Sequence, residues 1–204
     1  MVVVLDGGSF HGAALSATFE EALRVVGDAA VVAVDMPIGL PPPYPRAADL
    51  AARSFVGPRR NSVFLTPLRE ALASSDYAEA VSLNRNATGK GISRQAFALR
   101  SKILEVDRLV SGHPSVIEVH PEVSFRELAG RWLDHAKRSW NGFMERRSLL
   151  AGAGLALPDR IEVAAPSEDV LDAAVAAWSA SRYARGEAQP LPADPTNRIG
   201  TIWR

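Results

Sequence analysis

The sequence contains no cysteine, and this absence excludes several kinds of chemistry. Disulfide bonds, zinc–thiolate centres and thiol nucleophiles all require that side chain. The sequence also has no apolar run approaching the ~20 residues that cross a bilayer. Its first residues lack the basic start and long apolar segment of a signal peptide. We therefore expect a cytoplasmic protein with no membrane partner.

Neither sign of charge is in excess, since 23 Lys and Arg residues balance 23 Asp and Glu residues. A chain without net charge has no strong overall attraction to nucleic acid. The balance does not hold locally, because residues 37–114 carry eleven cationic side chains against six anionic ones. A basic segment and an acidic remainder favour a site where one part holds an anionic substrate and the other holds a metal ion.

The length of 204 residues and the hydrophobic content of 47% predict one globular domain, residues 1–204. Residues 1–17 alternate around an Asp-Gly-Gly turn, which predicts a β-hairpin. Thr18 and Glu21 form a capping box for a helix that ends at Gly27. The apolar run that ends at Asp35 predicts a strand covered on both faces, and hence a mixed α/β sheet.

Residues 37–114 contain helical patterns but no buried strand, so we expect a helical, loop-rich insertion there. A further strand is predicted for residues 115–120, and residues 124–154 are predicted to be helical. Another helix starts after Pro166, with Ser167 as its expected N-cap, and ends near Gly186. The last eight residues predict a short strand.

Asp35 stands where the predicted buried strand ends and a proline-rich loop begins. Ligands of open α/β sheets gather at the carboxyl ends of strands, so this acid is a candidate site residue. A structural alternative is that Asp35 caps the following loop through local hydrogen bonds.

Asp172 is the one polar residue between Val170 and Trp178, in a helix that we expect to pack against the sheet. Such an acid faces either solvent or a site. Asp169 lies three residues earlier on the same side of the helix. Asp169 also suits a purely structural role, because acids in the first turn stabilise the helix dipole.

Glu118, His120 and Glu122 form a third group, in the segment IEVHPEV. Alternate residues of a strand share a face, so Glu118 and His120 should lie together. The alternative is the solvent-facing side of an edge strand. Carboxylates from three separate elements would suit Mg²⁺ or Mn²⁺ in phosphoryl transfer, where the metal activates water and no protein nucleophile is needed.

Several segments resemble the domain of unknown function family 429, among them VDMPIGLP, SVFLTPLR, GISRQ, IEVHPEVSF and DVLDAAVAAW. The resemblance runs from about Val2 to Trp203. It implies a ribonuclease H-like mixed sheet flanked by helices, with the insertion after the strand ending at Asp35. It also implies a nuclease-like activity that uses acids on the first strand, the fourth strand and the last helix.

Carried over to this sequence, the resemblance makes Asp35, Glu118 and Asp172 the catalytic and metal-binding acids, with Asp169 as a further metal ligand. It places possible substrate contacts on segments of the insertion and beside Glu118. These residues are Arg46, Arg53, Ser93, Gln95, Lys102, His120 and Glu122.

The start of the chain departs from the family pattern. Members usually open with a strand bearing a VDG motif, followed by a GW pair, and only then by a strand like VVVLDGG. On one interpretation the family's first strand and its acid are missing, and Asp6 is a hairpin-turn residue. On the other, residues 2–6 are the first strand and Asp6 is the acid.

We therefore expect a metal-dependent phosphodiester hydrolase with Mg²⁺ or Mn²⁺ as its cofactor and nucleic acid as its substrate. Two alternatives stay open: a non-catalytic protein that binds a nucleotide or nucleic acid, and a hydrolase of a small phosphorylated metabolite. An oligomer of identical chains is also left open.

Overall fold

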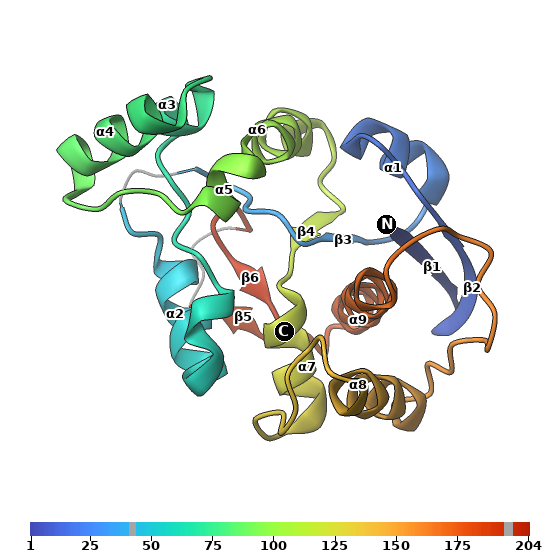
Figure 1. Cartoon of the computed structure of the whole chain (residues 1–204). Coiled ribbons are helices and arrows are strands. Elements are labelled where there is room, and N and C mark those ends of the chain that lie inside the picture. The colour runs from blue at the N-terminus through green and yellow to red at the C-terminus, as the bar shows by residue number, and fades with distance from the viewer. Residues whose placement is uncertain (41–43, 194–197) are drawn as a thin grey trace.

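A computed structural model describes residues 1–40, 44–193 and 198–204 of the chain (Figure 1). The strands are β1 (Val2–Asp6), β2 (Ser9–Ala14), β3 (Val32–Val34), β4 (Val116–Glu118), β5 (Pro190–Leu191) and β6 (Ile202–Trp203). The helices are α1 (Phe19–Val26), α2 (Ala47–Val56), η1 (Gly57–Ser62), α3 (Arg69–Ala73), α4 (Tyr77–Thr88), α5 (Arg94–Ala98), α6 (Arg100–Leu109), η2 (Val110–Gly112), α7 (Pro121–Ala129), α8 (Trp140–Gly152) and α9 (Ser167–Ala184).

The predicted hairpin and the helix after it are confirmed. β1 and β2 pair antiparallel across Gly7 and Gly8, which both adopt positive φ angles that favour glycine. The backbone N–H of Glu21 donates to the Oγ1 of Thr18 over 3.1 Å, and Gly27 ends the helix. The carboxylate of Glu21 accepts from the backbone N–H of Ala17, one residue before the position that a capping box predicts.

The remaining strands form a separate mixed sheet in the order β3-β4-β6-β5. β3, β4 and β6 are parallel, and β5 runs antiparallel to β6. Helices flank this sheet, as the sequence predicts. α6, η2 and α1 pack on one face through Val106, Val110 and Leu23, and α9 packs on the other face through Ala176.

The hairpin does not continue this sheet, because β1 forms no ladder with β3 in the described parts of the chain. Figure 1 shows the hairpin, in dark blue, apart from the other four strands. β3 is consequently an edge strand, and its residues are half-buried rather than covered on both faces as predicted.

The region between β3 and β4 is helical, as expected for the insertion, and has no strand among its described residues. The helical segment predicted after β4 is interrupted: α7 ends at Gly130, which has a φ of 64°, and α8 begins after Ser139. α9 starts after Pro166 as predicted, but its N-cap is Pro166 itself and not Ser167.

α9 is the helix that links the two sheets. Leu171, Ala174 and Val175 are buried in a core with Val3 of β1, and Ala176 is buried against Ile117 of β4. The position of α9 therefore fixes how the hairpin faces the four-stranded sheet. No helix in the described residues combines the length and the apolar character needed to cross a membrane.

Candidate functional site

A cavity of about 730 Å³ lies between the hairpin and β3. β1 and β3 form its two sides, α9 lines one face and α1 lines the other. Asp35, Asp169 and Asp172 line it together, so the structure brings three of the predicted acids to one cavity.

Asp35 follows the last residue of β3. It is exposed and lines the cavity. Burial raises the pKa of Asp35, although the charges of His120 and Lys137 partly oppose this effect. The side chain is open to the cavity, so its desolvation by the surrounding protein is incomplete.

Asp172 lies in the second turn of α9 and is held by Lys137, whose ammonium group donates to its carboxylate. Burial raises the pKa of Asp172 to about 6, although the hydrogen bond and the charge of Lys137 lower it. The negative charge of Asp35 raises the same pKa, which means that the two acids lie close enough to repel each other.

His120 belongs to this group and not to Glu118. It precedes α7, and its positive form would lower the pKa of both Asp35 and Asp172. Its Nε2 lies 3.3 Å from the carbonyl oxygen of Ser62. Its Nδ1 is buried and makes no hydrogen bond to any described residue.

Glu118 is directed away from the cavity. It pairs with Val34 across the parallel ladder, and partners in a ladder point to the same face. Asp35 follows Val34 and points to the opposite face. The expected convergence of Asp35, Glu118 and Asp172 on one metal is therefore not found in the structure.

Glu118 instead forms a buried ion pair with Arg46. The guanidinium of Arg46 donates to its two oxygens over 2.6 and 2.9 Å, and the backbone N–H of Ile38 donates to it over 2.6 Å. Burial raises the pKa of Glu118, although Arg46 and the N–H of Ile38 act against it. Arg46 is buried too and also binds Asp49, so the predicted substrate contact of Arg46 is replaced by a structural role.

Glu122 is likewise engaged in ion pairs. It lies in the first turn of α7, 3.1 Å from a nitrogen of the buried Arg146 and 3.1 Å from Arg59. Its predicted contact with substrate would require one of these partners to leave.

The other predicted substrate contacts lie in the insertion. Arg53 donates to the carbonyl oxygen of Val63 over 2.7 Å, and Ser93 caps α5 through the N–H of Ala96. Gln95 and Lys102 are exposed. None of the insertion residues that the structure describes lines the cavity that holds Asp35.

Asp6 ends β1 and pairs with Ser9 at the hairpin turn, so it is a turn residue as the first interpretation predicts. The turn lies beside the end of α9, because a β-carbon added to Gly8 would lie 3.9 Å from the Oγ of Ser181. Ser181 is nine residues after Asp172, or roughly 14 Å along the helix axis. Asp6 is therefore at the opposite end of the cavity from Asp172.

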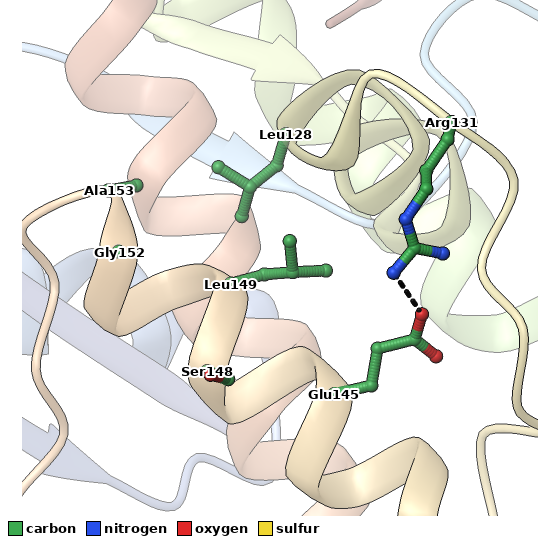
Figure 2. A pocket seen from close by; sticks show the side chains of 7 residues that line it. All are labelled: Leu128, Arg131, Glu145, Ser148, Leu149, Gly152 and Ala153. Carbon is green, nitrogen blue, oxygen red and sulfur yellow. Dashed lines mark ion pairs between the residues drawn. The ribbon is translucent and has the colours of Figure 1, made fainter.

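A second hollow of about 600 Å³ lies between α7 and α8 (Figure 2). Its carboxylate, Glu145, is paired with Arg131 at 3.0 Å and accepts from the backbone N–H groups of Asp134 and His135. Burial raises the pKa of Glu145, but these hydrogen bonds outweigh it, so that the pKa lies below its ordinary value. The hollow thus has no unengaged acid, and the cavity beside Asp35 is the better candidate site.

Comparison with known proteins agrees with the resemblance seen in the sequence. Residues 1–197 match the family described as "Protein of unknown function (DUF429)". The chain belongs to this family. No curated protein and no solved structure matches the chain.

Lys137 is the residue of this DUF429 protein that sequence reasoning missed. It lies in the loop between α7 and α8, 35 positions from Asp172. One signal was available: Lys137 is one of only three lysines in the chain, and the other two lie in the insertion. Its partner, however, depends on how that loop packs against α9.

The raised pKa of Asp172 predicts a pH dependence of stability. Its pKa is about 6 in the folded protein, against an ordinary value of 3.8. The folded protein then binds the proton more tightly, so the free energy of unfolding falls as pH rises from ~4 to ~6. The difference in pKa corresponds to about 3 kcal/mol.

Urea unfolding of wild type and Asp172→Asn at a series of pH values measures this effect. The variant lacks the titrating group, so its stability relative to wild type should increase by up to about 3 kcal/mol between pH 4 and pH 7. A constant difference between the two proteins across this range would contradict the assignment.

Proposed function

We propose that this DUF429 protein is a metal-dependent phosphodiester hydrolase with a ribonuclease H-like arrangement. The observation that carries the proposal is the meeting of Asp35, directly after β3, and Asp172 of α9 at one end of a cavity, each with a pKa that burial raises. Acids with raised pKa values in a cavity are candidate functional groups.

The donor set fits Mg²⁺ or Mn²⁺. The described residues contain no cluster of three or more His, Asp or Glu side chains arranged to hold a metal ion. Mg²⁺, however, usually keeps several waters and is bound by one or two carboxylates together with substrate phosphates. A cation held by Asp35 and Asp172 would supply activation of water and stabilisation of the leaving oxygen.

The neighbouring cations have complementary roles in this proposal. Lys137 neutralises Asp172, which lowers the repulsion between Asp172 and Asp35. Lys137 and His120 would both attract a phosphate oxygen bound beside Asp35 and Asp172. Lys102 and the other exposed cations of the insertion would hold the rest of an anionic substrate.

A second candidate is binding without catalysis. It is favoured by one observation: Glu118 is paired with Arg46, so it is not available beside Asp35 and Asp172 as the catalytic acid that the family resemblance implies. In that case the same cavity end would bind a nucleotide or nucleic acid and would not turn it over.

Purified protein should be assayed with Mg²⁺ or Mn²⁺ against single-stranded and double-stranded DNA and RNA, branched DNA, and a panel of nucleotides and sugar phosphates. We expect hydrolysis of a nucleic acid that is lost when EDTA removes the metal and returns with Mn²⁺. Turnover of the small phosphates alone would replace nucleic acid as the substrate class. Salt-dependent binding with no turnover would favour the second candidate.

A further inference from the structure

The cavity beside Asp35 has the shape of a vacant position in a sheet. One of its sides is β1, whose other edge pairs with β2, and the opposite side is β3, whose other edge pairs with β4. α1 and α9 cover its two faces. A strand placed there would be flanked by two strands and covered by two helices, like a central strand of an α/β sheet.

Both flanking strands offer backbone groups to this space. On β3, the N–H of Val32 donates to Ser115 and the carbonyl oxygen of Val34 accepts from Val119. Alternate residues of a strand direct their N–H and C=O groups to opposite edges. Ala33 therefore directs both groups into the cavity, where no described backbone group bonds to them.

The two edges run in opposite directions. The end of β1 lies near Ser181, late in α9, whereas the end of β3 lies near Asp172, early in α9. A strand placed between β1 and β3 would run parallel to one of them and antiparallel to the other. Regular backbone hydrogen bonding is possible in both kinds of pairing.

The volume suits a short strand. One residue of a packed sheet occupies roughly 160 Å³, from a rise of about 3.3 Å, a strand spacing of about 4.8 Å and a layer thickness of about 10 Å. The cavity of about 730 Å³ then holds four to five residues, and β1 lines it over a similar length, Val2–Leu5.

The lining is uncharged over the middle of the cavity. β1 contributes valines and a leucine, and α9 contributes small residues that leave room above the helix: Ala173, Ala176, Ala177 and Ala180. Charged side chains lie only at the ends, with Asp35, Asp169 and Asp172 at one and Arg185 at the other. This distribution matches an uncharged apolar strand and does not match nucleic acid along the length of the cavity.

We propose that the cavity is a binding site for an extended, uncharged, apolar segment of a separate partner protein. The segment adds to β1 and β3 at once and joins the hairpin and the four-stranded sheet into one continuous sheet. Backbone hydrogen bonds to two edges supply affinity, as in β-augmentation, and the alanine face of α9 selects small or β-branched side chains. The proposal does not depend on a metal or on catalysis.

The test uses a fluorescein-labelled peptide, acetyl-VVAVV-amide, with the dye on a polyethylene glycol linker. We expect saturable binding by fluorescence anisotropy, and at least tenfold slower amide hydrogen exchange in β1 and β3 when the peptide is bound. An analogue with N-methyl groups on alternate residues keeps the apolar side chains but loses backbone donors. It should bind at least tenfold more weakly.

Two variants change the cavity in different ways. Ala177→Phe fills it, and Ala33→Pro removes an N–H that faces it, at an edge position where proline is tolerated. Each should weaken peptide binding at least tenfold. Ala151→Phe, the same change at an exposed position on α8, should leave binding unchanged.

Three results would overturn the proposal. The first is equal binding of the peptide and its N-methylated analogue, which would mean nonspecific apolar adsorption. The second is the absence of peptide binding to wild type. The third is concentration-dependent dimerisation that slows exchange of the same amides without peptide, which would mean that a second copy fills the cavity. None of these results bears on hydrolysis, so this proposal and the proposed function fail independently.

Discussion

Asp35→Asn is expected to reduce metal-dependent hydrolysis by at least ~1,000-fold. Charge stabilisation by a bound metal ion contributes several kcal/mol, and each 1.36 kcal/mol is a factor of ten in rate. Asparagine has nearly the same shape as aspartate but lacks the charge that would hold the cation. The rate should be measured with saturating Mn²⁺ on the best nucleic-acid substrate found in the panel.

Asp6→Asn is the matched control, because Asp6 is an exposed acid at the hairpin turn, at the end of the cavity opposite Asp172. It should retain full activity. Urea unfolding should show that Asp35→Asn is as stable as wild type or more stable, since burial disfavours the charged form of Asp35. Equal hydrolysis by wild type and Asp35→Asn would remove Asp35 from the reaction.

Arg46→Met is expected to destabilise the fold by about 3–5 kcal/mol, because it leaves the buried charge of Glu118 without its partner. Asp49 would lose the same partner. The effect should be measured as a change in the free energy of unfolding in urea at pH 7.5. A loss of this size is a large fraction of the total free energy of unfolding of a typical domain.

The double variant Arg46→Met, Glu118→Gln separates a structural role of Glu118 from a metal-binding role. Removing both charges should recover part of the stability that Arg46→Met loses. Glu118→Gln alone should leave Mn²⁺ binding intact. If Glu118→Gln abolished Mn²⁺ binding without unfolding the protein, Glu118 would be a metal ligand after all.

Local signals account for the parts of the fold that the sequence predicted correctly. The Asp-Gly-Gly turn fixed the hairpin, and Thr18 and Gly27 marked the ends of α1. Asp35 and Asp172 stood out because each interrupts an apolar run in a segment that packs against the core. Signals of this kind depend only on neighbours in the sequence.

Glu118 shows where such reasoning stops. Alternation along β4 predicts which residues share a face, but not which face meets α9. The partner of Glu118 is Arg46, 72 positions earlier, and nothing local connects the two residues. Alternation predicts that His120 lies beside Glu118 only if the strand continues to His120, whereas β4 ends at Glu118.

The lateral order of the strands also cannot be predicted from local sequence signals. Pairing between β1 and β3 depends on what lies between them, and strand order is a long-range property. The division of the predicted helical segment into α7 and α8 is different, because Gly130 and Ser139 are local sequence signals for the end of one helix and the start of the next.

The proposed function depends above all on Asp35 and Asp172 holding a divalent cation together. Anomalous diffraction at the manganese edge, from a crystal soaked in Mn²⁺, tests it most directly. We expect a peak within coordination distance of both carboxylates and none beside Glu118. A peak at Glu118, or no peak at Asp35 and Asp172 in crystals that bind Mn²⁺ elsewhere, would contradict it.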